Sequence, residues 1–276
     1  MSGRGSQGRR SGDPKDQKLY FAQGPEATGK STFINAIRAV FGTYGGSVDP
    51  ETLLKKKWDG VRHDLADLAG LRLVTSIEPQ DGRGWDAQRI QQLTGGDPVK
   101  SRRLYENDFT YTPMFTLIIG ANNKPEVPAT NGAFWRRIRL VKFDQQIPEA
   151  ERDRDLPRKL REPEVQRAIL AWLVRGCLAW QAEPVMIEPE PVRQATTEYR
   201  EENDPVRKWA DECLIFGPGE SASANELRGS YVTWCRENGE TPMPQSKPWG
   251  KALEGLRFIR DADARRIWRG GSVRQP

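Results

Sequence analysis

The sequence of 276 residues is poor in the residue types that build disulfide frameworks, zinc sites and membrane spans. Its three cysteines are odd in number and lack Cys-x-x-Cys spacing, and His63 is the sole histidine, so reduced thiols are expected. It has no apolar run near the roughly 18 residues of a membrane helix, and no apolar signal segment at its start. These absences predict a cytoplasmic protein with no membrane partner.

Positive charge is in slight excess and gathers at the two ends of the chain. Lysine and arginine number 43 against 38 acids, which gives a net charge of +5 and permits a polyanionic partner without requiring one. Residues 1–16 are mostly Gly, Ser, Arg and Asp, which predicts a disordered basic tail. With 36% hydrophobic residues, the chain can bury the core of one or two domains.

The most specific motif is a glycine-rich loop at residues 24–31, which fits G-x-x-x-x-G-K-[ST]. An apolar segment at 19–22 precedes it, and apolar positions with helical spacing follow at 33–41. Strand, loop and helix are the context in which backbone N–H groups bind phosphate oxygens. We expect Lys30 to neutralise the β- and γ-phosphates of a nucleotide, and Ser31 to hold Mg²⁺. The nucleotide-binding residues are predicted to be Gly24, Pro25, Glu26, Ala27, Thr28, Gly29, Lys30, Ser31 and Thr32.

Polar residues follow two further buried-strand candidates. Glu78 comes directly after the apolar segment 71–77, and Asn122 follows 117–121. A carboxylate at such a strand end can bind Mg²⁺ or polarise the attacking water, and an amide can hydrogen-bond the γ-phosphate. Alternatively, Glu78 begins a surface loop and Asn122 belongs to a turn. Arg136 and Arg137, between a short helix and a strand, are candidates to act on the nucleotide of a neighbouring subunit.

A cationic hairpin is predicted from strands at 98–105 and 109–120. Its cations are Lys100, Arg102 and Arg103, with Tyr105 and Tyr111 near the turn. Cations beside aromatic rings suit single-stranded nucleic acid, because the charges follow the phosphates and the rings stack on bases. A solvated hairpin face is the alternative.

The C-terminal half is predicted to contain a helical region and a second small domain. Residues 149–183 are predicted to be helical, with apolar residues that pack in a core. The prolines between 184 and 191 indicate a linker. Three helices and a basic hairpin after residue 201 suggest a winged helix, a domain that binds either DNA or protein. Its phosphate-contacting candidates are Lys247, Lys251, Arg265 and Arg266.

The motifs GPEATGKST, LRLVTSIEP, LTGGDPVKSRRLYENDFTYTP, IIGANNKPEV and FWRRIRLVKF closely resemble, in order and spacing, the superfamily 3 helicase module of the phage/plasmid primase family, related to the pox-virus primase-helicase. The resemblance covers about residues 17–270. It implies an α/β fold: an AAA+-like P-loop NTPase core with a central parallel sheet at 17–147, a helical extension and linker at 148–200, and a winged helix at 201–276.

The resemblance also implies roles for single residues. ATP would bind at Gly24 to Thr32, with Glu78 as the Walker B acid, Asn122 as sensor, Arg137 or Arg136 as arginine finger, and DNA contacts on the 100–103 hairpin. Members form hexamers that move along one DNA strand. The implied protein is an ATP- and Mg²⁺-dependent DNA helicase of phage, prophage or plasmid replication in a bacterial host cell. Its partners would be single-stranded or forked DNA, identical subunits and a separate primase or replication initiator.

Three features depart from the family pattern. Glu26 and Thr28 replace a glycine and an asparagine of the loop, Gln91 replaces a common lysine, and the sequence starts almost at the first ATPase strand, without a primase or collar domain. These departures leave open a nucleotide-switched DNA-binding protein with weak or no hydrolysis. A P-loop kinase or packaging motor is a third alternative, disfavoured because no acceptor-substrate site is evident.

Overall fold

The computed structural model describes residues 16–55, 63–77, 83–103, 105–127, 131–182, 187–261 and 267–274. The chain forms two compact units, the first ending at Tyr199 and the second beginning at Arg200. The predicted basic tail lies almost entirely outside the described residues. No helix in the described ranges is both long enough and apolar enough to span a bilayer.

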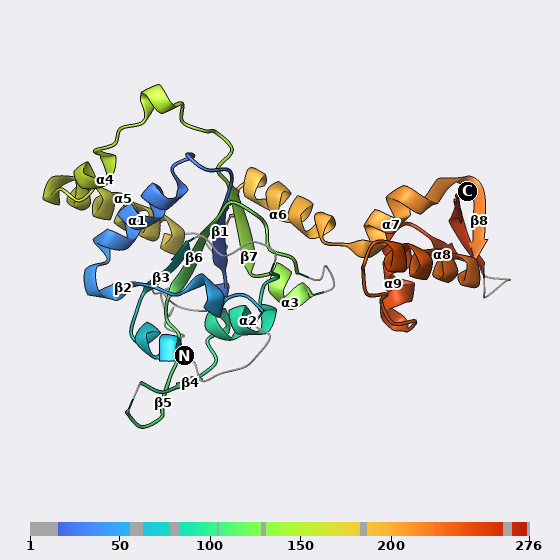
Figure 1. Cartoon of the computed structure of the whole chain (residues 1–276), viewed down its shortest axis with the longest axis horizontal. Coiled ribbons are helices and arrows are strands. Elements are labelled where there is room, and N and C mark those ends of the chain that lie inside the picture. Colours follow the sequence, from blue (N-terminus) through green and yellow to red (C-terminus); the bar gives the residue numbers. More distant parts are fainter. Residues whose placement is uncertain are drawn as a thin grey trace, which may run out of the picture. The chain divides into compact units, whose positions relative to one another are not determined.

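A five-stranded parallel sheet forms the centre of the first unit (Figure 1). The strand order is β2-β3-β6-β1-β7, so β1 lies between β6 and β7. Apolar residues run along the inner strands because the sheet is covered on both faces. The strands are β1 (Leu19–Gln23), β2 (Gly45–Ser47), β3 (Leu73–Ile77), β6 (Thr116–Ala121) and β7 (Ile138–Lys142).

Helices of different lengths surround this sheet. Helix α1 (Lys30–Val40) packs on β2, β3 and β6, and α2 (Ala87–Gly95) contacts α3 (Gly132–Trp135). The segment that begins at Pro50 forms only a 3₁₀ turn, and Asp49 caps it by accepting a hydrogen bond from the Glu51 amide. The 3₁₀ turns are η2 (Gly42–Tyr44), η3 (Pro50–Thr52), η4 (His63–Leu68) and η5 (Glu149–Glu151).

Aromatic side chains fasten α6 (Glu190–Glu202) to the core of the first unit. Trp85 is fully buried and donates its indole N–H to the Tyr199 hydroxyl at 2.9 Å. The Tyr199 ring also lies 6.0 Å from Phe21 of β1 and 5.1 Å from Trp135. Of the linker predicted at 184–191, residues 187–189 are indeed without helix, whereas α6 already begins at Glu190 and is anchored to the core by Tyr199.

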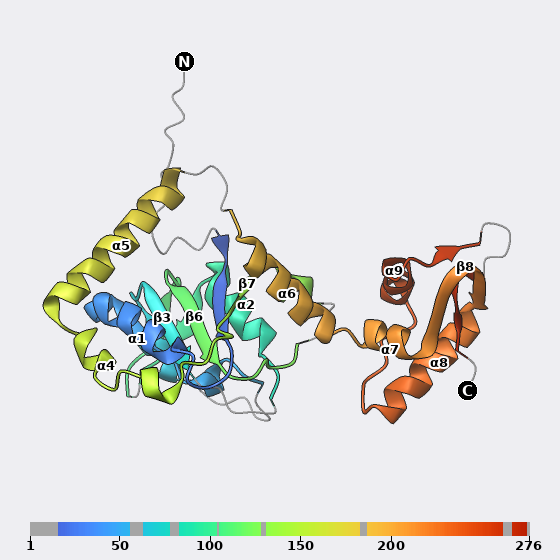
Figure 2. The same cartoon turned by 90° about the horizontal axis from the view of Figure 1, so that it is seen from above.

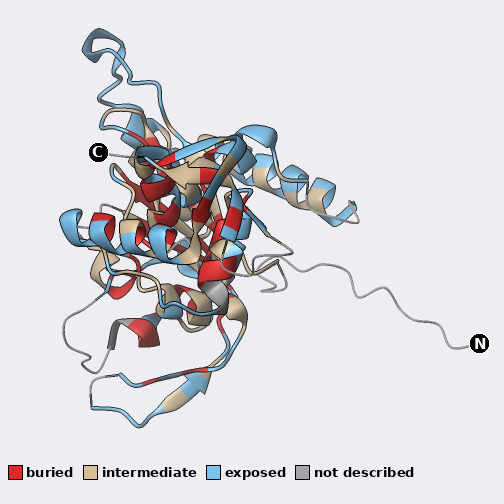
Figure 3. Cartoon of the chain, turned by 90° about the vertical axis from the view of Figure 1, so that its right-hand side faces the viewer, coloured by how far each residue is buried: buried red, intermediate tan, exposed pale blue. Residues whose placement is uncertain are grey.

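The predicted hairpin is present but shorter. Strand β4 (Val99–Ser101) pairs with β5 (Phe109–Tyr111), and the hairpin projects from the sheet (Figures 1 and 3). The single strand predicted over 109–120 is wrong, because β5 ends before Pro113 and β6 begins at Thr116 in the central sheet. Proline has no N–H to donate to a sheet, which explains the break.

The core role predicted for the helical region after residue 149 is also wrong. It consists of α4 (Leu156–Lys159) and α5 (Pro163–Ala182), and none of the described α5 residues is buried. The reason is that α1 already covers the sheet, so α5 packs on the outside of α1 (Figures 1 and 2).

The second unit has three helices around a small antiparallel sheet of order β8-β10-β9. At its centre Tyr231 stacks on Trp249, and Trp209 packs edge-on against Tyr231. A capping box at Ser223 and Glu226 starts α8, as the sequence indicates. The elements are α7 (Pro205–Cys213), β8 (Leu214–Ser223), α8 (Ala224–Glu237), α9 (Lys247–Gly255), β9 (Ile259–Arg260) and β10 (Ile267–Val273).

Candidate nucleotide-binding site

The glycine-rich loop joins the carboxyl end of β1 to α1. A Cβ on Gly24 would lie 2.0 Å from the carbonyl oxygen of Phe143, so only glycine fits where the loop leaves the sheet. Gly29 has φ of +84° and Ala27 has φ of +59°, which is the left-handed conformation. These positions turn the backbone so that α1 starts directly at Lys30.

The side chain of Lys30 lies inside this loop and is only 6% exposed. Its ammonium donates to the carbonyl oxygens of Gly24 at 2.7 Å and Pro25 at 2.6 Å, and to the Thr28 hydroxyl at 3.2 Å. Within the described chain, no side chain caps the N-terminus of α1. A buried cation and uncapped helix amides fit a phosphate group, because both favour negative charge.

The acidic residue of the loop does not disturb this arrangement. Glu26 is exposed, and its backbone carbonyl accepts a hydrogen bond from the Gln146 side chain at 3.2 Å. The carbonyl of Ala27 accepts from the amide of Ile147 at 2.9 Å. The segment after β7 therefore supports the loop from outside, and the Glu26 carboxylate has solvent around it, which reduces its repulsion of a phosphate.

The neighbouring strand ends bring a second polar group to the loop. The Gln23 side chain, at the end of β1, donates to the carbonyl of Asn122 at 2.8 Å, and the Gly24 amide donates to the Ala121 carbonyl at 3.3 Å. Asn122 therefore lies beside the loop, as the order of the motifs indicates. The sequence analysis missed Gln23, although a polar residue at the end of an apolar strand was a usable signal.

The predicted Walker B acid follows the next strand in the sheet. Ile77, the last residue of β3, is in register with Gly120 of β6, so β3 ends at the same edge as β1 and β6. Glu78 itself lies outside the described residues. Its proposed contact with Mg²⁺ and Ser31 therefore stays a prediction.

Arg136 and Arg137 lie at the amino ends of the parallel strands, whereas the loop lies at their carboxyl ends. They directly precede β7, which is parallel to β1, and the carbonyl of Arg137 accepts from the amide of Leu19 at 2.9 Å. A five-residue strand spans about 17 Å. Neither arginine can therefore reach the phosphate loop of its own chain.

The two arginines differ sharply in exposure. Arg137 is 5% exposed and donates to the Ala133 carbonyl at 2.6 Å, and burial lowers its pKa with a smaller effect from the Arg136 charge. Arg136 is exposed, and its guanidinium approaches the Gln17 side chain at 3.4 Å. Between the two, only Arg136 presents a guanidinium to another molecule.

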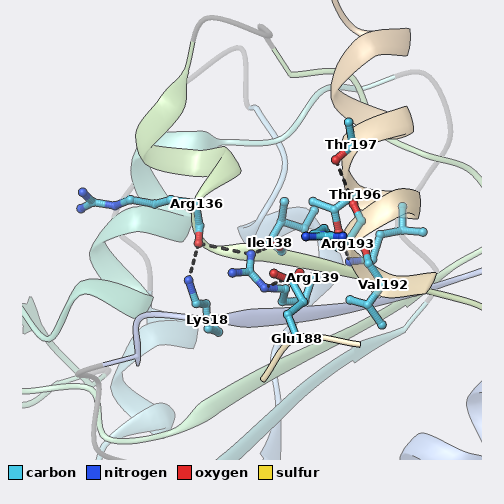
Figure 4. Close-up of polar contacts among 10 residues, drawn as sticks. Lys18, Arg136, Ile138, Arg139, Glu188, Val192, Arg193, Thr196 and Thr197 are labelled. Atoms are coloured by element: carbon cyan, nitrogen blue, oxygen red, sulfur yellow. Dashed lines mark hydrogen bonds and ion pairs between the residues drawn. The ribbon is translucent and has the colours of Figure 1, made fainter. Parts of the chain in front are cut away.

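Basic side chains fix the backbone of Arg136 (Figure 4). Lys18 donates to the Arg136 carbonyl at 2.6 Å, and Arg139 donates to the same oxygen at 3.3 Å. Arg139 in turn pairs with Glu188 at 2.7 Å, in a partly buried ion pair. Burial and the nearby Arg139 charge lower the pKa of Lys18. The sequence analysis assigned no role to Lys18.

Gln91, which departs from the family pattern, helps to hold the segment that carries Arg136. Its amide donates to Asn131 Oδ1 at 3.1 Å, and Asn131 caps α3 by accepting from the Phe134 amide. Gln91 therefore helps to hold the short helix that ends at Arg136.

The hairpin brings its predicted cations together, and acidic residues lie beside them. Lys100 pairs with Asp108 at 2.7 Å, and this hydrogen bond lowers the pKa of Asp108. Arg103 lies 3.8 Å from Asp67 and 3.9 Å from Glu106, and its guanidinium sits over the Phe109 ring. These exposed pairs are weak and leave the cations available to phosphates.

Arg102 and Tyr105 complete the outer part of the hairpin. Arg102 is exposed, and Tyr105 is 97% exposed in the left-handed conformation, with φ of +64°. An exposed ring among cations is the combination that binds unpaired bases.

Of the cations predicted for the second unit, Lys251 is exposed on α9 and Lys247 begins the same helix, although its side chain is not described. Arg265 and Arg266 lie outside the described residues. The adjoining sheet does carry a cation against an aromatic ring, since Arg260 lies 4.9 Å from the Trp268 ring centroid.

Comparison with known proteins connects the chain to viral proteins. A family of unknown function, DUF5906, matches residues 22–137. A protein of Frog virus 3 (isolate Goorha) named "Putative helicase 022R" is 26% identical over 95% of this chain and 28% of its own length. A protein of Acanthamoeba polyphaga mimivirus named "Putative helicase L207/L206" is 22% identical over 86% of this chain and 27% of its length. A third, from Sputnik virophage, is 29% identical over 48% of this chain and 18% of its length.

The chain is therefore a distant homologue of proteins that carry a helicase name, and it spans about a quarter of the length of the two with the longest matches. Among solved structures, an apo form of the NrS-1 C-terminal region aligns with 86% of this chain and 60% of its own, at 11% identity and a TM-score of 0.42.

Proposed function

We propose that this chain is an ATP-hydrolysing DNA helicase module with an AAA+-like, superfamily 3 core. The observation that carries the proposal is the buried Lys30 ammonium inside a glycine-rich loop at the start of α1, with Asn122 at the adjacent strand end. The helicase names of its distant homologues support the same function. As in the phage/plasmid primase family it resembles, we place its work in phage, prophage or plasmid replication.

Each polar group near the loop has a role in this proposal. Lys30 and the first-turn amides of α1 bind the phosphates, while Asn122 orients the γ-phosphate and Gln23 holds the Asn122 backbone. Ser31 and Glu78 hold Mg²⁺, which neutralises developing charge on the phosphates when bound. Glu78 also accepts a hydrogen bond from the attacking water and so directs it at the γ-phosphate.

Hydrolysis in this proposal needs a neighbouring subunit. Arg136 lies at the far end of the sheet from its own loop, so it stabilises the transferring phosphoryl group only on the ATP of another copy. Copies that contact each other through two different surfaces form a ring when the rotation between neighbours closes. We propose a homo-hexamer, with Arg136 in the role that the sequence analysis divided between Arg136 and Arg137.

DNA is the proposed substrate of the hairpin and of the second unit. Lys100, Arg102 and Arg103 follow the phosphates of one strand while Tyr105 stacks on a base. The element order of the second unit supports a winged helix, with α9 and the adjoining strands as its DNA- or protein-contacting part. A separate primase or replication initiator is the proposed protein partner.

Replacing Lys30 tests the nucleotide site. Lys30→Ala should abolish nucleotide binding and DNA-stimulated ATP hydrolysis, because it removes the cation buried in the loop. The measurement is phosphate release with and without single-stranded DNA, together with fluorescence binding of an ATP analogue. Turnover that survives Lys30→Ala would contradict the proposal. Binding by the unaltered protein without turnover on any DNA would favour a nucleotide-switched DNA-binding protein.

Removing the hairpin cations tests the DNA contact. The combined Lys100→Ala, Arg102→Ala and Arg103→Ala variant should bind single-stranded DNA more weakly. The slope of log K against log salt should also flatten by about 2, since each phosphate contact to a single strand contributes about 0.7. The matched control replaces Arg158, Lys159 and Arg161, which are exposed cations near α4. Equal weakening by both sets would mean that the hairpin has no special role.

A further inference from the structure

Helix α5 is apolar on nearly all sides and yet exposed. From Ala168 to Trp180 its sole charged residue is Arg175. None of its described residues is buried, and four of its large apolar side chains are about half exposed, while others, such as Ile169 and Leu173, are partly buried. Helices of this composition are normally covered on every side. The exposed fractions are 49% for Leu170, 53% for Trp172, 48% for Val174 and 60% for Leu178.

The position of α5 relates it to the nucleotide site. It packs on the outer side of α1, whose first residue is Lys30 (Figures 1 and 2). Phe33, in the first turn of α1, is also 44% exposed. Apolar surface is therefore present both on α5 and beside the phosphate loop.

Exposed apolar residues also lie at the amino ends of the strands, the end of the sheet opposite the phosphate loop. Tyr44 directly precedes β2 and is 60% exposed, and Met114 precedes β6 and is 41% exposed. Backbone hydrogen bonds join these strand starts, since Arg72 donates to the Tyr44 carbonyl at 2.8 Å and accepts from Thr116 at 2.9 Å. Arg136 lies at the same end, before β7. The surface that would bring Arg136 to a neighbouring subunit therefore also offers that subunit apolar contacts.

We propose that α5 is the docking surface for a second copy of this chain, which contacts it through the end of the sheet bearing Tyr44, Met114 and Arg136. The inference rests on the proposed function, because a guanidinium that must reach another copy's loop requires that copy to lie beside α1. The four exposed α5 side chains offer a few hundred Å², a substantial part of the ~800 Å² that each partner buries in a stable interface.

A charge placed in the exposed α5 stripe tests this contact. The unaltered protein, with an ATP analogue and single-stranded DNA, should show a mass in light scattering several times its 31.3 kDa. Leu178→Glu should lower that mass to one chain, because a carboxylate would be buried in an apolar interface. Arg167→Glu, on the same helix but outside its apolar segment, should leave the assembly unchanged. Far-ultraviolet circular dichroism should show equal helix content in both variants.

A second variant identifies the opposing surface. Met114→Glu alone should also give single chains, whereas an equal mixture of Met114→Glu and Leu178→Glu should form dimers and nothing larger. Each variant keeps one intact half of the contact, so the mixture restores one interface. An assembly that tolerates Met114→Glu but not Leu178→Glu would mean that α5 meets α5, which would overturn the proposed contact.

Nucleotide binding separates this inference from the proposed function. Leu178 is not in the phosphate loop, so Leu178→Glu should bind the ATP analogue with unchanged affinity. If the unaltered protein binds and hydrolyses ATP but remains a single chain, the α5 contact is wrong while the nucleotide site stands. If it assembles through α5 and never binds nucleotide, the proposed function is wrong while the contact stands.

Discussion

Arg136→Ala should reduce DNA-stimulated ATP turnover by about 10³ to 10⁵, the range for loss of an arginine finger. Arg136 is exposed, so its removal should leave the stability of the chain nearly unchanged. The affinity for nucleotide should also change little, because the guanidinium would contact the phosphoryl group mainly as charge develops during transfer. Steady-state phosphate release, with kcat and KM determined separately, measures the effect.

Arg137→Ala is the matched comparison at the adjacent position. Arg137 is buried and holds the Ala133 carbonyl, so its loss should lower the melting temperature as well as activity. If Arg137→Ala abolished turnover in a fully stable protein while Arg136→Ala did not, the assignment would be reversed.

Mixing two inactive variants tests whether the arginine acts on a neighbour. Arg136→Ala keeps a complete phosphate loop, and Lys30→Ala keeps the arginine. An interface between the two therefore contains one intact site, and a mixture should recover part of the activity that each lacks alone. No recovery at any ratio, with assembly confirmed by mass, would contradict action between subunits.

Trp85→Ala should have the largest effect on stability, a loss of about 3 to 5 kcal/mol in the free energy of unfolding. Trp85 is fully buried, packs edge-on against Phe21 of β1 at 5.5 Å and donates to the Tyr199 hydroxyl. Its removal leaves a cavity between the sheet and α6 and removes the hydrogen bond that the Tyr199 hydroxyl accepts. Because natural domains are stable by only about 5 to 15 kcal/mol, the first unit should be severely weakened. Urea denaturation followed by circular dichroism measures the loss.

The control for this variant is a tryptophan of the same size on the surface. Trp172 of α5 is 53% exposed, so Trp172→Ala should cost well under the loss at Trp85 when both are measured on single chains at low concentration. Similar losses at the two positions would mean that the aromatic cluster does not hold the first unit together.

The strand, glycine-rich loop and helix around Lys30 could be predicted from the sequence because their signals are local. The loop, the helix from Lys30 and the polar residue after β6 each follow from short-range spacing and from strands that end at one edge. The strand order itself requires contacts between distant segments, yet the motif order already placed Asn122 beside the loop. A phosphate-binding loop is built from consecutive residues, so it can be predicted from the sequence without knowing the rest of the fold.

Features that depend on the tertiary environment could not be predicted from the sequence. Composition shows α5 as a core helix, but only the structure shows that α1 occupies the position next to the sheet. The sequence analysis did not predict strand β8, which contains Gly217, Pro218 and Gly219, residue types that are depleted in strands. Neighbouring arginines with identical chemistry cannot be distinguished by sequence, whereas burial of Arg137 and exposure of Arg136 separate them at once.

Strand β7 connects two places that would belong to different catalytic centres. It begins at Ile138, directly after Arg137, and just past its other end the Phe143 carbonyl abuts Gly24 of the phosphate loop. In a ring of the proposed kind, a shift of one phosphate loop along this strand would therefore move the arginine that serves the ATP of the neighbouring subunit.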